Sequence, residues 1–164
     1  NGRIGRILNV LYLARVGLLG IPILYLSRGI TRTKNDYYHH LQAVRDDGDW
    51  EPWLTYMLDA VSITSRATLE LIEGLRSLMA DYKRRIRADL PHLYSQDLLN
   101  NLFRHPYTRI EFLQKDLSIS RQTAAKYLDK LSELGFLHKQ PAGRNNYYIN
   151  NPLVSLSMSV SAEH

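Results

Sequence analysis

Asn1-Gly2-Arg3-Ile4-Gly5-Arg6 is followed directly by an apolar run with helical spacing, so this stretch predicts the entrance of a helix. The first amides of a helix are unpaired and its macrodipole is positive there, which suits an anion. Gly2 allows a close backbone approach, and Arg3 and Arg6 lie three residues apart on one side of the first turn. The stretch therefore predicts a phosphate-binding turn. The alternative is an ordinary helix start with two solvated arginines.

The rest of the first 90 residues predicts a mainly α fold. After a first helix over residues 3–19, shorter helices are expected over 23–31 and 36–45, the latter capped by Asn35. A long helix is expected over about residues 50–88, because apolar or small residues recur with three-four spacing for about 50 Å of helix. These are Trp50, Leu54, Met57, Val61, Thr64, Thr68, Leu71, Leu75, Leu78 and Tyr82.

Composition bounds the function only loosely. The chain has 164 residues, 45% hydrophobic and 23% charged, which is typical of a globular protein. It has no cysteine, which excludes disulfides and thiolate metal sites and fits a cytoplasmic protein. The net charge of +5 favours nucleotides, nucleic acid or acidic surfaces as partners, and no stretch predicts a membrane span. Because the first methionine is Met57, we expect the chain to be a fragment or a processed product.

A second, smaller domain is expected over residues 94–155, after a boundary at 89–94 and before a tail at 156–164. One helix is predicted over residues 98–103. A second is expected to begin at a capping box formed by Thr108 and Glu111. A third is predicted over residues 121–134, capped by Ser120 and ended by Gly135. Strands are predicted at 136–139 and 147–149, joined by a turn. Three helices and a two-stranded wing indicate a winged helix-turn-helix domain.

The third helix of this domain carries the candidate DNA-binding side chains. Its buried stripe leaves polar residues outward, and arginine, glutamine and threonine at a helix N-terminus are suited to base edges in the major groove. The candidates are Arg121, Gln122, Thr123, Lys126 and Lys130, with Arg144 at the tip of the wing. The alternative is that this face is a docking or dimer surface, since any exposed helix carries polar residues.

The pattern N-G-R-x-x-R, a long apolar helix, Tyr37-Tyr38 and residues 47–53 together resemble the second half of a Fic domain, whose motif reads H-P-F-x-(D/E)-G-N-G-R-x-x-R. The resemblance implies a Fic-type helical bundle remnant at residues 1–90. It also implies transfer of AMP from ATP, with Mg²⁺, to a Ser, Thr or Tyr hydroxyl of a target protein. The nucleotide-binding residues it implies are Asn1, Gly2, Arg3, Gly5, Arg6, Tyr37 and Tyr38.

The same resemblance places the catalytic histidine and the acidic Mg²⁺ ligand upstream of Asn1, so this chain is expected to contain no catalytic or metal-binding residue and to be inactive alone. Two other interpretations stay open. In one, the protein is a DNA-binding transcriptional regulator, which strongly salt-dependent binding to a duplex would support. In the other, the chain is an interaction module whose long helix forms a homodimer.

Overall fold

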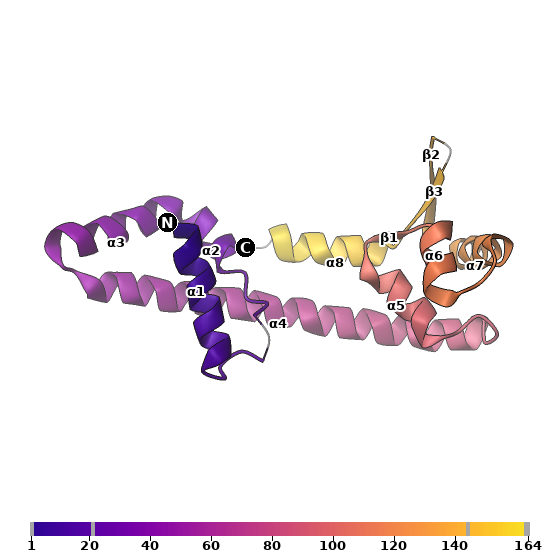
Figure 1. The fold of residues 1–164 in the computed structure, drawn as a ribbon, viewed down its shortest axis with the longest axis horizontal. Helices are drawn as coiled ribbons and strands as arrows, with labels where there is room; N and C mark the ends of the chain where they lie inside the picture. Colours follow the sequence, from indigo (N-terminus) through magenta and orange to yellow (C-terminus); the bar gives the residue numbers. More distant parts are fainter. Residues whose placement is uncertain (1, 21, 144, 163–164) are drawn as a thin grey trace. The chain divides into compact units, whose positions relative to one another are not determined.

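A computed structural model describes residues 2–20, 22–143 and 145–162, and it confirms a mainly α chain (Figure 1). The described residues form two compact units, Asn1–Glu70 and Leu71–Glu163. The long helix α4, Trp50–Asp89, contributes residues to both units. The sequence predicted this helix correctly to within one residue. We describe each unit by itself.

The first unit is built from helices around a small core. These are α1, Gly2–Arg15; α2, Leu26–Arg32; α3, Lys34–Asp47; and the first half of α4. The core combines Leu24, Leu26 and Ile30 with Tyr37 and Ala60. The ring of Tyr37 packs edge-on against Trp53, with 5.1 Å between the ring centroids, so α3 and α4 are joined by an aromatic contact.

Several expected positions in this unit were wrong. α1 ends at Arg15 and not at Leu19, and Gly17 follows with a left-handed φ of 79°. Ile7 and Leu11 are 59% and 51% exposed, because α1 packs through Val10 and Leu13. α3 already begins at Lys34, so that Asn35 lies inside the helix and is not its cap.

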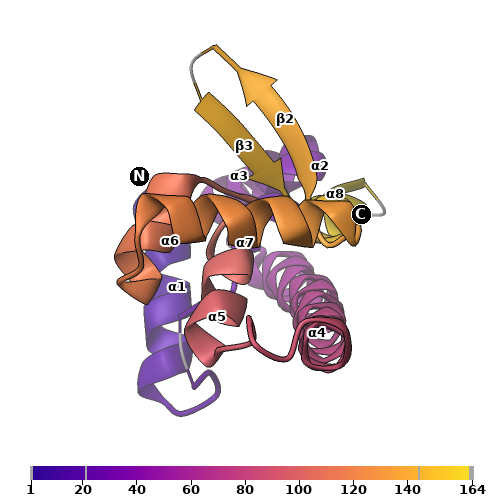
Figure 2. The same cartoon turned by 90° about the vertical axis from the view of Figure 1, so that its right-hand side faces the viewer.

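The second unit packs helices against a small antiparallel sheet with strand order β1-β3-β2 (Figure 2). Its elements are the end of α4; α5, Gln96–Arg104; β1, Tyr107–Thr108; α6, Ile110–Leu117; α7, Arg121–Glu133; β2, His138–Ala142; β3, Asn145–Ile149; and α8, Asn151–Ala162. The fully buried core includes Tyr82, Ile86, Leu98, Leu113, Leu128 and Phe136. Tyr82 and Ile86 of this core come from the end of α4.

Local capping signals predicted part of this unit. The Ser120 hydroxyl accepts a hydrogen bond from the Thr123 amide at 3.1 Å and caps α7, and Gly135 follows the helix with a φ of 75°. The prediction of a capping box at Thr108 was wrong. Thr108 lies on β1 and is 2% exposed, and its hydroxyl donates to Asn101 Oδ1 at 2.7 Å, so Arg109 takes the N-cap position of α6.

The end of the chain also differs from expectation. Phe136 and Leu137 are buried core residues that precede β2, and the β2–β3 hairpin is longer than predicted. Residues 156–162, expected as a tail, belong to α8. A Cβ atom on Gly74 would lie 2.6 Å from Leu156 Cδ1. The absent side chain at Gly74 therefore lets α8 pack closely on α4.

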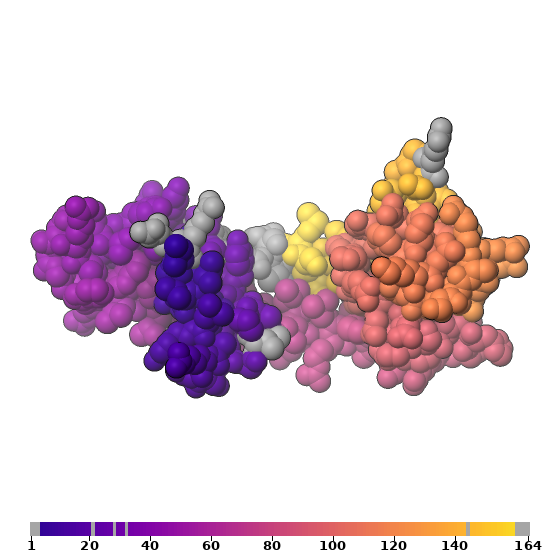
Figure 3. Space-filling view, viewed as in Figure 1, coloured from indigo at the N-terminus to yellow at the C-terminus, as the bar shows by residue number. Residues whose placement is uncertain are grey.

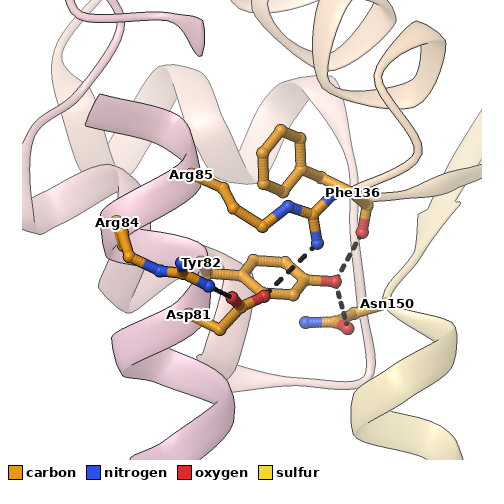
Figure 4. A network of polar contacts seen from close by, with 6 residues as sticks. All are labelled: Asp81, Tyr82, Arg84, Arg85, Phe136 and Asn150. Carbon is orange, nitrogen blue, oxygen red and sulfur yellow. Dashed lines mark hydrogen bonds and ion pairs between the residues drawn. The ribbon is translucent and has the colours of Figure 1, made fainter. Parts of the chain in front are cut away.

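A buried polar network joins α4 to the end of the sheet (Figure 4). The Tyr82 hydroxyl lies 2.7 Å from the Phe136 carbonyl oxygen and 3.0 Å from Asn150 Oδ1, so its single proton is shared between two acceptors. Asn150 is 1% exposed, and its amide donates to the Leu102 carbonyl oxygen at 3.2 Å. Asn150 Oδ1 also accepts from the Leu153 amide, which satisfies an otherwise unpaired group at the start of α8.

Burial raises the pKa of Tyr82 to about 12. Between the unfolded value of 10.0 and the folded value, the native state holds a proton that the unfolded chain has lost, so stability falls as pH rises through this window. We expect the free energy of unfolding to fall between pH 10 and pH 12, with up to about 1.4 kcal/mol per pH unit from this one group. Urea titrations at pH 9, 10 and 11 measure the slope.

The Tyr82→Phe variant tests the assignment, because it cannot ionise at this position. The free energy of unfolding of the variant should fall less steeply with pH than that of the wild type. It should still fall, since burial also raises the pKa of Tyr148. Equal slopes for the variant and the wild type would contradict the role given to Tyr82.

Candidate functional site

The predicted phosphate-binding turn lies at the beginning of α1. Gly2 and Arg3 belong to the first turn of the helix, whereas Asn1 and the Arg3 side chain lie outside what the structure describes. No heavy atom lies within 4 Å of a Cβ built on Gly5, so this glycine faces open space.

Arg6 is half-buried and lines a cavity of about 710 Å³ in the first unit. Most of the wall is apolar, and its residues are Ile7, Val10, Leu11, Pro22, Leu24, Tyr25 and Leu26, with Ser27 and Thr31. Binding sites for small molecules and cofactors typically occupy 300–1,000 Å³ and combine apolar walls with a few polar groups. The cavity thus has the size for a nucleotide, and Arg6 is its one charged lining residue among those described. Helix α1 lies on the surface of the first unit, in indigo in Figure 3.

The tyrosine pair does not line this cavity. Tyr37 is 9% exposed and packs in the core of the first unit. Tyr38 is 57% exposed, and Lys34 Nζ lies 6.0 Å from the centroid of its ring. Packing in the core accounts for the position of Tyr37 without a ligand, so the structure adds no support for an adenine contact at either residue.

The candidate DNA-binding residues of α7 are mostly exposed. Arg121, Gln122, Lys126 and Lys130 all lie on the solvent side of the helix, opposite the buried Ala124, Leu128 and Leu131. Two of these cations have acidic neighbours, since Arg121 lies 3.6 Å from Glu111 and Lys130 lies 2.9 Å from Glu133. Among the described residues, no acidic partner is found for Lys126. Arg144 lies outside the described residues.

Thr123 differs from the other α7 candidates. It is half-buried, and its hydroxyl lies 2.9 Å from the Ser120 hydroxyl within the N-terminal cap of the helix. Its hydroxyl therefore already has a structural partner. The methyl group is the part of Thr123 that is suited to a thymine methyl.

An ion pair that the sequence analysis missed joins the hairpin to α7. Lys139 Nζ lies 2.7 Å from Asp129 Oδ1, and the Tyr148 hydroxyl donates to the same oxygen at 2.8 Å. The hydrogen bond from Lys139 holds the pKa of Asp129 below its usual value, and the same bond raises the pKa of Lys139. Residues ten positions apart on different elements give no local signal of such a contact.

No group of three His, Cys, Asp or Glu side chains suited to a metal ion occurs among the described residues. Within the same described part of the chain, no helix is long and apolar enough to cross a membrane.

Part of the chain matches the model of a known protein family. Residues 78–153, which cover most of the second unit, match the family model described as "Protein adenylyltransferase SoFic-like, C-terminal domain". The matched segment runs from the end of α4 through the start of α8, and residues 1–77 lie outside it. The second unit is therefore similar to the C-terminal domain of a Fic-related protein adenylyltransferase.

Proposed function

We propose that the chain is the C-terminal part of a Fic protein that transfers AMP from ATP to a hydroxyl side chain of a target protein. The observation that carries the proposal is the match of residues 78–153 to the C-terminal domain of SoFic-like protein adenylyltransferases. The N-G-R-x-x-R pattern supports it independently, because it falls on the start of α1, outside the matched segment.

The first unit contributes binding and charge stabilisation to this reaction. Phosphoryl transfer depends on positioning and on neutralising phosphate charge more than on covalent chemistry. The amides of the first turn of α1 and the Arg6 guanidinium supply such groups, and the apolar wall of the Arg6 cavity provides a place for the base and sugar. The general base and the Mg²⁺ ligand are assigned to the part of the Fic motif that precedes Asn1.

The gene upstream of Asn1 tests this proposal first. It should encode H-P-F-x-(D/E)-G directly before the asparagine, and the parent protein should then label a protein substrate or itself with α-labelled ATP. An upstream sequence without the motif histidine would exclude AMP transfer by this mechanism. If the gene encodes the complete motif but the protein transfers no AMP, the assignment to the Fic fold stands and the proposed activity is excluded.

A second candidate function rests on α7. We propose that α5, α6, α7 and the β2–β3 hairpin form a winged helix-turn-helix domain that binds DNA, with α7 in the major groove. The exposed Arg121, Gln122 and Lys126 at the N-terminal part of α7 support this proposal. The pairing of Arg121 with Glu111 counts against it, because that carboxylate reduces the positive charge of the face.

Salt dependence of binding measures the DNA function directly. We expect the logarithm of the binding constant to fall linearly with the logarithm of salt concentration, as phosphate contacts release counterions. Lys126→Gln removes one such contact and should reduce the slope by about 1. Lys115→Gln on α6 makes the same change of charge away from α7 and should leave the slope unchanged. No binding at low salt, or equal effects of the two variants, would exclude DNA recognition by α7.

A further inference from the structure

A small cavity in the second unit lies apart from both proposed sites. It has a volume of about 190 Å³ and is formed by the end of α5, by β1 and by one side of α6. Its lining residues are Asn101, Arg104, His105, Tyr107, Thr108, Phe112, Lys115 and Asp116. None of them comes from α7 or the hairpin, and none belongs to the first unit.

The acidic side chain in this cavity, Asp116, already accepts hydrogen bonds from two neighbouring side chains. Asp116 Oδ2 accepts from Asn101 Nδ2 at 2.8 Å, and both carboxylate oxygens lie 3.1 Å from Arg104 Nη1. Asn101 is 4% exposed and is held on its other side by the Thr108 hydroxyl. The floor of the cavity is therefore rigid, and its one carboxylate has little capacity to accept further hydrogen bonds.

Donors remain in excess around this floor. The second N–H of the Asn101 amide and the further N–H groups of Arg104 have no partner among the described residues. The exposed Lys115 ammonium also has none there, and Asp116 is the only acidic side chain in the lining, so the lining carries a positive charge of one without His105. An anionic group with several acceptor oxygens complements this arrangement.

The walls are aromatic. Tyr107 is 40% exposed and lies between His105 and Phe112, with ring centroids 6.4 Å and 6.3 Å away. Such walls accept the methylene groups of a side chain and exclude water from the charged contacts at the floor. The volume of about 190 Å³ is below that of sites for whole small molecules, so it suits a single side chain of a larger ligand.

We propose that this cavity binds an aspartate or glutamate side chain from an acidic segment of a partner protein. The donors of Asn101, Arg104 and Lys115 surround the carboxylate, and Tyr107 and Phe112 contact its methylene groups. Duplex DNA fits less well, because its phosphates lie on a regular convex backbone and reach a recessed floor poorly. The proposal is independent of AMP transfer.

NMR titration of the 164-residue chain tests the site. The probe is the peptide acetyl-Gly-Glu-Gly-Glu-Gly-amide, and its matched control has glutamine in place of both glutamates. We expect saturable shifts of the Asn101 side-chain amide and of the Lys115 and Thr108 backbone amides with the glutamate peptide alone. Lys115→Gln should weaken binding about tenfold or more, since it removes a charge-assisted hydrogen bond. Lys34→Gln, the same change at an exposed lysine of α3, should leave binding unchanged.

Each other outcome would overturn the proposal. Equal shifts with the glutamine peptide, or no shift at Asn101, would show that the cavity does not select a carboxylate. Equal weakening by Lys115→Gln and Lys34→Gln would indicate unspecific attraction to a basic protein. Tighter binding of inorganic phosphate than of the peptide at the same residues would assign the cavity to a free anion, and shifts there with a DNA duplex but not with the peptide would assign it to nucleic acid.

Discussion

Replacing Asn150 with alanine should lower the free energy of unfolding of the chain by about 2–4 kcal/mol. Asn150 is 1% exposed and connects three parts of the second unit through one amide group. The Asn150 Nδ2 group donates a hydrogen bond to the Leu102 carbonyl oxygen at the end of α5. Its Oδ1 atom accepts from the Tyr82 hydroxyl on α4 and from the Leu153 amide on α8. Few single side chains in the molecule have so many buried partners.

The expected loss has two parts. Without the amide, the Leu102 carbonyl oxygen stays buried with its side-chain partner gone, and an unsatisfied buried acceptor costs about 1–3 kcal/mol. The Leu153 amide loses the cap of α8, which costs about 0.5–2 kcal/mol. The Tyr82 hydroxyl keeps the Phe136 carbonyl oxygen as an acceptor, so its position should change little.

Urea unfolding monitored by circular dichroism measures this loss. Asn100→Ala is the matched control, because Asn100 is exposed on α5 and accepts a surface hydrogen bond from Gln96 at 3.1 Å. Its effect should stay within about 0.5 kcal/mol, as for most surface substitutions. Equal effects of the two variants would mean that the buried network does not hold α8 to the unit.

The sequence could predict the elements that depend on local contacts, but not those that depend on contacts between distant positions of the chain. The long helix, the Ser120 cap and the turn at Gly135 depend on neighbours within a few residues, and each was predicted correctly. β1 was missed because its residues are held by pairing of Thr108 with Tyr148, forty positions along the chain. A two-residue strand shows no alternation of its own, so Thr108 was interpreted as a helix cap.

α8 was missed for a related reason. Its residues, Asn151–Ala162, include many serines and no charge, a pattern with weak helical character on its own. The helix is instead supported from outside, by the Asn150 cap and by the contact of Leu156 with the surface left open at Gly74. In the fold, Gly74 is the position on α4 against which α8 packs.

The candidate sites also include residues whose exposure the sequence could predict and residues whose exposure it could not. Exposure of Arg121, Gln122, Lys126 and Lys130 follows from the helical period of α7, so the sequence was sufficient to place them on one face. The burial of Tyr37 and exposure of Tyr38 could not be predicted, because either residue could face α4 and the choice depends on the contact of Tyr37 with Trp53. The 190 Å³ cavity combines residues from three elements and has no signal in any one of them.

Replacing Arg6 with alanine in the parent protein is expected to reduce AMP transfer about 10²–10³-fold, the usual effect of removing one group that stabilises transition-state charge. Arg6 lines the cavity of about 710 Å³ and is its one charged lining residue among those described. On the proposed function, its guanidinium neutralises phosphate oxygens of ATP beside the first turn of α1. A fork of N–H groups suits those oxygens better than a point charge does, so Arg6→Lys should restore only part of the activity.

The measurement is the initial rate of transfer from α-labelled ATP, with thermal unfolding of each variant recorded in parallel. Arg15→Ala is the matched control, because Arg15 is exposed in the last turn of the same helix and does not line the cavity. A variant that unfolds at the temperature of the wild type but loses transfer assigns Arg6 to the reaction. Full activity of the alanine variant would place the phosphates away from α1, and the role of the N-G-R-x-x-R stretch would then be limited to starting the helix.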